Sequence, residues 1–177
     1  VKEEAEITLE DLIAAEEVIV TISHAGYIKR NAVSLYRAQR RGGKGKIGMG
    51  IKEEDFVVNL FTASTHDSLL FFTDAGKVYW LKVHEIPEAS RGAKGKALVN
   101  LLALSSNEKV TATLPVKEFR DDRYIVMGTK KGIIKKTELS AFSNPRQGGI
   151  IALGLESGDR LISVQLTDGQ REILLGT

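Results

Sequence analysis

The sequence predicts an all-β protein made of propeller-like blades of four strands. Three observations predict this fold class. The chain repeats itself, first at an offset of 50 residues and then at 56. Each copy opens with a short strand-like run closed by a turn that ends on glycine. Each copy also has room for about four short strands in about 50 residues, the period of a propeller blade, and such sheets must stack to bury their faces.

A different kind of segment precedes the first copy. Residues 1–17 contain seven acids and one lysine, a net charge of 1 − 7 = −6. Thr8 stands just ahead of Glu10 and Asp11, the pattern of a capped helix start with acids in its first turn. We therefore expect residues 1–17 to be an acidic linker at the end of a preceding domain, with a short helix or helical turn inside it.

The second copy is the clearest repetition of the first. An offset of 50 places 18–49 over 68–99 without gaps, and 8 of the 32 aligned positions are identical. The identities cluster at the Ala-Gly pair of 25–26 and in the basic glycine-rich stretch 41–46. Even glycine averages only about 7% of residues, so clustered matches of this kind indicate a repeat.

A third copy follows at an offset of 56, where 69–76 lies over 125–132. The six added residues fit in the charged stretch 116–122, because a surface loop lengthens at little cost. We expect blades at about 18–67, 68–122 and 123–170. The segment 171–177 (REILLGT) lies over 123–129 (RYIVMGT), so we expect it to be the first strand of a fourth blade.

Within each copy we expect two strands joined by a glycine turn, then a basic glycine-rich loop, then a further strand. Gly26, Gly76 and Gly132 supply the positive φ that a tight hairpin needs. The expected strands are 18–23, 27–30 and 56–63 in the first copy, 68–73, 77–81 and 110–114 in the second, and 124–129, 133–136 and 161–166 in the third.

Composition limits the classes of function. Hydrophobic residues make up 42% and charged residues 27%, as in a folded globular domain. No apolar run approaches the roughly 18 residues of a membrane span, and the acidic start lacks the basic-then-apolar pattern of a signal peptide, so we expect neither insertion nor export. The sequence has no cysteine, which excludes disulfides and thiolate zinc sites.

The charge pattern points to a polyanionic partner. No acid lies between residues 18 and 52, whereas this window carries eight bases. Such an imbalance repels itself unless an anion answers it, and polyphosphate is the commonest answer. Nucleic acid is therefore the leading candidate partner. A solvated basic face, balanced by the acidic linker, is the alternative at this point.

The sharpest motif is QRRGGKG at 39–45, echoed at 90–96 and faintly at 144–149. Cations that alternate with glycine let the backbone approach a duplex while amides and cationic groups reach phosphate oxygens. Gly43 to Gly48 also match the G-x-G-x-x-G dinucleotide pattern, but strand-like sequence follows where a helix should begin. The sequence also lacks a P-loop, so we expect no nucleotide hydrolysis by this segment.

QRRGGKG is identical to the signature called the gyrase A box, and SHAGYIKR before it and KGKIG at its end strengthen the likeness. With its acidic linker and later degenerate boxes, the whole chain resembles the C-terminal domain of the DNA gyrase A subunit. The resemblance implies a β-pinwheel, a propeller relative of roughly six blades that exchange strands with their neighbours. It also implies double-stranded DNA wound and bent on the outer rim.

The resemblance further implies a parent enzyme, a bacterial ATP-dependent type II topoisomerase that introduces negative supercoils. It implies an A2B2 assembly of the gyrase A and B subunits in the cytoplasm, at the nucleoid. The cutting tyrosine and the ATP and magnesium sites are expected on other segments, so we expect this segment to be non-catalytic and to hold no cofactor or metal. The topoisomerase IV A subunit, a propeller scaffold for protein partners and a nucleotide-dependent enzyme are the alternatives.

From the box we expect Arg40, Arg41 and Lys44 to be the main phosphate ligands. We expect the box glycines to set the loop path and Gln39 to be a polar contact or brace. The glycines are Gly42, Gly43 and Gly45. The further bases expected on the same cationic track are Lys46, Arg91, Lys94, Lys96, Lys29, Arg30, Lys135, Lys136 and Arg146. For each of these further bases, an ordinary solvated surface side chain is the alternative.

The remaining candidates for chemistry are weak. His24, His66 and His84 lack the spacing of metal ligands. The cluster at 53–55 is expected to be a solvated acidic turn, since adjacent acids do not converge on one ion. The four tyrosines fit core packing or a groove edge, and we expect Trp80 to pack between blades.

Overall fold

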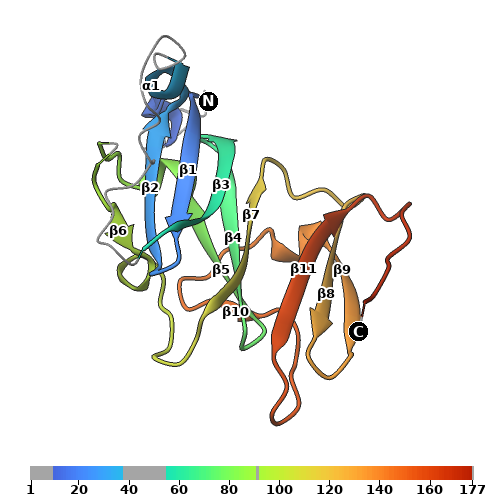
Figure 1. Cartoon of the computed structure of the whole chain (residues 1–177). Coiled ribbons are helices and arrows are strands. Elements are labelled where there is room, and N and C mark those ends of the chain that lie inside the picture. The colour runs from blue at the N-terminus through green and yellow to red at the C-terminus, as the bar shows by residue number, and fades with distance from the viewer. Residues whose placement is uncertain (1–9, 38–54, 91, 177) are drawn as a thin grey trace, which may run out of the picture. The chain divides into compact units, whose positions relative to one another are not determined.

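The computed structural model describes residues 10–37, 55–90 and 92–176. In these ranges the chain is all-β, as predicted (Figure 1). It divides into two compact units, each treated by itself below. Unit 1 comprises the described residues of Val1–Ser68 and Leu81–Leu101, and unit 2 those of Leu69–Trp80 and Leu102–Thr177.

The elements follow the predicted order. The strands are β1 (Glu17–Ser23), β2 (Tyr27–Ala32), β3 (Val57–Ser64), β4 (Ser68–Thr73), β5 (Lys77–Lys82), β6 (Lys96–Ala97), β7 (Val110–Val116), β8 (Tyr124–Thr129), β9 (Ile134–Glu138), β10 (Ile150–Ile151) and β11 (Leu161–Thr167). The short helices are η1 (Glu10–Leu12), α1 (Val33–Arg37), η2 (Val83–Glu85), η3 (Leu98–Asn100) and η4 (Leu139–Phe142). All the strands expected in the first three copies are present, with ends that differ by a residue or two.

The strands form three sheets, each built around one hairpin. Their orders are β3-β1-β2-β6, β10-β5-β4-β7 and β11-β8-β9. In each sheet the hairpin's first strand pairs on its other side with the strand that ends the copy. In the first sheet, for example, Val18 of β1 lies opposite both Ala32 of β2 and Ala63 of β3. The three sheets therefore share one arrangement of strands.

Two of the sheets take their fourth strand from later in the chain. β6 follows β5 in sequence but pairs with β2, where Tyr27 lies opposite Ala97. β10 follows β9 but pairs with β5, where Val78 lies opposite Ile150. Each added strand comes from the glycine-rich loop of the next copy. This confirms the exchange of strands between neighbouring copies that the family resemblance implied.

The three hairpins turn in the same way. Gly26, Gly76 and Gly132 have φ values of 85°, 76° and 88°. Each glycine N–H donates at 3.0 Å to the carbonyl three residues earlier, on Ser23, Thr73 and Thr129 respectively. A positive φ is the backbone state that glycine adopts without steric cost, so the predicted role of these glycines is confirmed.

The first strand of each hairpin is largely buried. β4 is buried along its whole length, and β1 along all but its first residue. Continuous apolar runs rather than alternating ones are what strands buried on both faces require. In unit 2 the core joins residues of β4 and β8 with Phe142, whose ring meets that of Phe72 edge-on at 5.7 Å. Trp80 packs against this core and donates its indole N–H to the Phe142 carbonyl at 2.8 Å, a packing role as predicted.

Two segments differ from expectation. Residues 171–176 form no strand, because a strand exists only when another strand pairs with it, and no described residues pair with this segment. The helix α1 after β2 was not foreseen. In the linker, η1 is the expected helical turn, whereas Thr8, expected to cap it, lies outside the described residues.

Candidate nucleic-acid interface

The intact box lies outside the described residues, as do Gln39, Arg40, Arg41, Gly42, Gly43, Lys44, Gly45, Lys46 and Arg91. Glu53 and Glu54 also lie outside them. The geometry of a box-like loop is visible instead in the two degenerate copies. These are the loop that ends at β6 in unit 1, called here loop 90–96, and the loop that ends at β10 in unit 2, called loop 144–149.

In unit 1, β2 holds the segment that leads into loop 90–96. The Arg30 Nε donates to the Ile86 carbonyl at 2.6 Å, and the Arg30 N–H donates to the Pro87 carbonyl at 3.2 Å. The buried Asn31 amide donates to the Ala89 carbonyl. Backbone and side-chain donors of one strand thus anchor three carbonyls of a segment more than 50 residues away in sequence.

Lys29, expected as a surface base, is fully buried. Its ammonium donates to the carbonyl oxygens of Ala93 at 3.0 Å and Ser90 at 3.3 Å. Burial lowers the pKa of this ammonium. The expectation that Lys29 lies on an exposed cationic track is therefore corrected: loop 90–96 covers it, and its polar partners belong to that loop.

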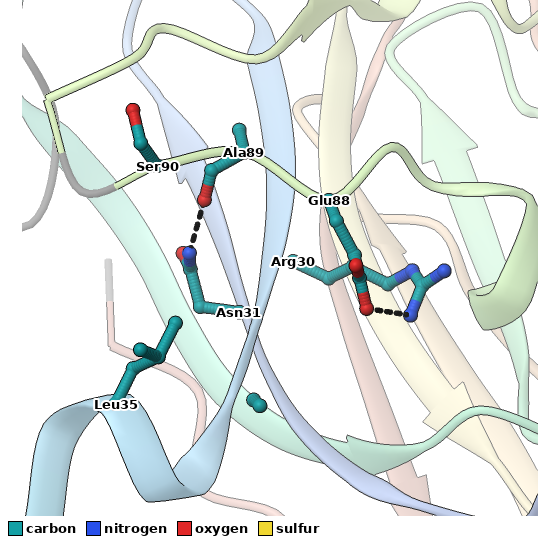
Figure 2. A pocket seen from close by; sticks show the side chains of 7 residues that line it. Arg30, Asn31, Leu35, Glu88, Ala89 and Ser90 are labelled. Carbon is teal, nitrogen blue, oxygen red and sulfur yellow. Dashed lines mark hydrogen bonds and ion pairs between the residues drawn. The ribbon is translucent and has the colours of Figure 1, made fainter.

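The Arg30 side chain is also mostly buried and has partners within the protein. Its side chain is 16% exposed, and Nη1 lies 3.2 Å from the Glu88 carboxylate. Figure 2 shows this pair, with Asn31 turned toward Ala89, on the wall of a cavity of about 340 Å³. The cavity lies between β2, α1 and the 88–90 segment, and its residues are Arg30, Asn31, Ala32, Leu35, Glu88, Ala89 and Ser90. Since a carboxylate already pairs with Arg30, the described residues of this cavity offer an anion no uncompensated cation.

The described bases of loop 90–96, Lys94 and Lys96, face solvent. Lys96 is exposed, and Lys94 is partly exposed with its ammonium 5.1 Å from the centre of the Tyr27 ring. A lysine over an aromatic face is held there electrostatically but remains open to water on its other side. Of the bases predicted on this loop, the described ones are thus placed as a surface cation set.

Unit 2 contains the same loop arrangement. Arg146 is exposed on loop 144–149, and Lys77 of β5 donates to the Gly148 carbonyl at 3.1 Å. Sequence comparison between the copies does not reveal this role for Lys77, because the residue aligned with it in the first copy is Tyr27. The tertiary structure reveals this role, because the loop carbonyl that Lys77 reaches lies 71 residues away in the chain.

In both loops, the residue just before the short strand is a glycine that lies directly on the preceding hairpin. Gly95 has φ 86°, and a Cβ placed there would lie 2.2 Å from the Ile28 carbonyl oxygen. Gly149 has φ 70°, and a Cβ there would lie 2.9 Å from the Val78 carbonyl oxygen. Val78 is the counterpart of Ile28 at the offset of 50, so the two loops dock at the same place. A side chain at either glycine would push the loop off its strand.

Lys135 and Lys136, on β9 of the third sheet, are both exposed as expected. The Lys135 ammonium donates to the Ala152 carbonyl at 3.1 Å, and the Lys136 ammonium lies 4.6 Å from the centre of the Tyr124 ring. Lys135 is the counterpart of Lys29, but in the part of the chain that the structure describes this sheet has three strands and no loop covering the lysine.

Unit 2 contains a buried acid, Glu108, that the sequence patterns did not indicate. Glu108 is 9% exposed and accepts hydrogen bonds from the Tyr79 hydroxyl at 2.7 Å, the Thr73 hydroxyl at 2.6 Å and the Ser105 N–H at 3.0 Å. Burial works against the ionised form, but these donors outweigh it and lower the pKa of Glu108. Burial raises the pKa of Tyr79. The counterpart of Tyr79 in unit 1 is Lys29, so this position is polar in both units.

The acid Asp55, expected in a solvated turn, has a defined structural role. It accepts the Ala25 and Phe56 N–H groups at 2.9 and 3.0 Å, and these bonds, with one from Ser23, lower its pKa against the effect of burial. Asp159 accepts the Lys131 N–H at 2.9 Å in the same way. These acids clamp hairpin turns. Among the described residues no group of three His, Cys, Asp or Glu side chains could hold a metal ion.

The comparisons with known proteins agree with the fold. The profile described as DNA gyrase C-terminal domain, beta-propeller, matches residues 17–64, 67–117 and 123–168. The chain belongs to the DNA gyrase C-terminal domain family. The matched segments coincide with the three copies. In the part of the chain that the structure describes, no helix is long and apolar enough to cross a membrane.

Members of the family are similar to the chain along nearly all of it. The DNA gyrase A subunit of Aeromonas salmonicida is 56% identical over 97% of the chain, and that of Haemophilus influenzae is 54% identical over 96%. The chain covers 18% and 19% of those two proteins, so it spans about a fifth of their length.

Two solved structures share the fold. The C-terminal domain of DNA topoisomerase IV superposes with a TM-score of 0.75 at 29% identity, over 89% of the chain and 47% of that structure. The DNA gyrase A C-terminal domain superposes with a TM-score of 0.65 at 26% identity, over 86% of the chain and 48% of that structure.

Proposed function

We propose that the chain binds double-stranded DNA through its phosphates and bends it, as the wrapping domain of a DNA gyrase A subunit. One observation carries the proposal. A loop with a glycine just before its short strand docks on the same point of the hairpin in both units, and each loop presents at least one base to solvent. A repeated cationic loop is suited to a repeated anionic ligand, and the phosphate backbone of a duplex is such a ligand.

Bending follows from the repetition. Phosphate contacts on successive copies draw the duplex along the protein surface, and smooth bending of 20 to 30 base pairs by 40 to 90° costs on the order of 1 to 6 kcal/mol. Counterion release from the neutralised phosphates would supply this free energy, so binding should be steeply salt-dependent and nearly indifferent to base sequence.

The identity of the parent enzyme is part of the same proposal. The complete QRRGGKG at 39–45 and the identities above 50% to gyrase A subunits favour gyrase over topoisomerase IV, although both share the fold. In that setting the segment would work with the gyrase B subunit in an A2B2 assembly at the bacterial nucleoid. Cleavage and ATP hydrolysis, with its magnesium, would then belong to other segments.

The experiment that tests the proposal replaces Arg40, Arg41 and Lys44 with alanine. DNA affinity is measured as a function of salt on a duplex of about 30 base pairs, and bending is measured by energy transfer between its ends. We expect the triple variant to lose about 0.9 units of the slope of log K against log salt for each phosphate contact removed, together with most of the bend. Unchanged slope and bend would refute the assignment.

A further inference from the structure

The buried ammonium of Lys29 contacts the turn at the start of loop 90–96. The Ala93 N–H donates to the Ser90 carbonyl at 3.0 Å, and the Lys29 ammonium reaches both that carbonyl and the Ala93 carbonyl, at 3.3 and 3.0 Å. One cation therefore holds the turn at both of its ends. Gly95 then rests against Ile28 and Lys29 themselves, so β2 grips the loop at two adjacent points.

This arrangement orients the outer side of the loop. In a trans peptide the C=O and the following N–H point in opposite directions. Because the Ala93 carbonyl faces Lys29, the Lys94 N–H faces away from it. An anion outside the loop would meet this amide, the side chains of Lys94 and Lys96, and the positive charge of the ammonium behind the peptide. Amides turned outward in this way are a common means of binding phosphate.

The counterparts of Lys29 show that the loop causes its burial. Lys135 in the third sheet, without a covering loop among the described residues, is exposed. In unit 2 the covering loop is present and the counterpart is Tyr79, with the carbonyl brace supplied instead by Lys77. A lysine that donates to a loop carbonyl is thus present at both loops, although it comes from different positions of the hairpin and only Lys29 is fully buried.

We propose, on the basis of the DNA-binding function proposed above, that Lys29 is a positioning residue for phosphate contact by loop 90–96. It touches no phosphate itself. It fixes the turn so that the Lys94 amide and the side chains of Lys94 and Lys96 face the same stretch of DNA backbone. A base that sequence analysis assigns to the surface then acts from below the surface, through two carbonyl groups.

A double-mutant cycle tests this role. Lys29→Met keeps the apolar stem and removes the ammonium. We expect it to weaken binding of the 177-residue chain to a duplex of about 30 base pairs and to lower the salt slope by up to about 2, the share of two phosphate contacts. In a Lys94→Gln/Lys96→Gln background the same change should weaken binding clearly less than it does in the parent, because the two lysine side chains that Lys29 positions are gone, while the Lys94 amide remains. An equal loss in both backgrounds, or none in either, would overturn the proposal.

A second measurement needs no DNA. In Lys29→Met, hydrogen exchange of the Ala93 amide should accelerate on the order of tenfold or more, while amides of β1 keep their protection. Lys29→Arg, which retains a donor, should restore much of the protection. The matched control is Lys82→Met, the same chemical change at a lysine of unit 1 whose ammonium pairs with Glu10 at 3.2 Å; it should leave Ala93 unchanged.

The outcomes separate the two proposals. Unchanged exchange at Ala93 in Lys29→Met would refute the positioning role, whatever the DNA result. If instead Ala93 exchanges faster but neither Lys29→Met nor the box triple variant alters DNA affinity, then the DNA-binding function is the proposal that fails.

Discussion

At the residue scale, the structure shows how polar side chains come to be buried in a domain with ordinary composition. Lys29 and Glu108 are both ionisable, both buried, and both surrounded by hydrogen-bonding groups. A buried charge is tolerated only when such partners replace water. Each of these residues finds partners in a segment far away in sequence, so neither role could be read from local pattern.

Glu108 gives a prediction about stability and pH. Because its pKa is lowered by folding, its contribution to the free energy of unfolding is present above the pKa of an unfolded glutamate and is lost as pH falls through the lower folded value. We expect Glu108→Gln to reduce the free energy of unfolding by about 1.5 to 3 kcal/mol at pH 7, since three donors lose a charged acceptor. The difference from the parent should shrink below about pH 4.

Urea unfolding measured at a series of pH values checks this prediction. The exposed Glu118 provides the control, and Glu118→Gln should leave the free energy of unfolding nearly unchanged. A Glu108→Gln deficit that is constant from pH 7 to pH 3 would show that the carboxylate charge is not what stabilises the site.

At the scale of elements, the docking of a glycine-rich loop on the neighbouring hairpin is the recurring construction. In the sequence, a glycine just before a short strand marks this docking. Glycine is needed there because the residue closely approaches the hairpin backbone. The loops therefore carry two kinds of residue. The bases face solvent, whereas the glycine before the short strand and the loop carbonyls contact the hairpin.

Gly95→Ala tests this construction. The residue has φ 86°, and its Cβ would meet the Ile28 backbone, so we expect a loss of about 1 to 3 kcal/mol or more in the free energy of unfolding. Gly92, in the same loop, has open space around it, and Gly92→Ala should stay within about 0.5 kcal/mol of the parent. Thermal or urea unfolding of the two variants side by side makes the comparison. Equal losses would contradict a docking role specific to Gly95.

At the scale of the whole molecule, the charge distribution matters more than the net charge of +2. Part of the positive charge of the acid-free window 18–52 is compensated within the protein, since Lys29 donates to carbonyl oxygens and Arg30 pairs with Glu88. Of the described bases expected on the cationic track, those that remain for an external anion are the exposed ones of loops 90–96 and 144–149 and of β9. A polyanion without sequence preference fits this distribution, because cations repeated on successive loops suit the repeated phosphates of a duplex, and phosphate contacts carry no sequence information.

We therefore predict that two duplexes of equal length and unrelated sequence compete for the chain with affinities within a few-fold of each other. Both should lose affinity steeply, with the same salt slope, as the salt concentration rises. Competition measured by fluorescence anisotropy tests this. A preference of about 1,000-fold or more, typical of specific binders, would contradict phosphate-based binding. Salt-insensitive binding to a polypeptide would favour the propeller-scaffold alternative.

The sequence by itself determined the repeated hairpins, their glycine turns, the basic loops and the family. These features are local, since a turn glycine, a strand run or a heptapeptide motif is complete within a few residues. The resemblance implied an exchange of strands, but only the tertiary structure identified β6 and β10 as the exchanged strands and showed that Lys29 lies beneath a loop while its counterpart Lys135 is exposed. The physical reason is distance along the chain: Lys29 meets its carbonyl partners more than 60 residues away, and no local pattern encodes which loop will cover a side chain.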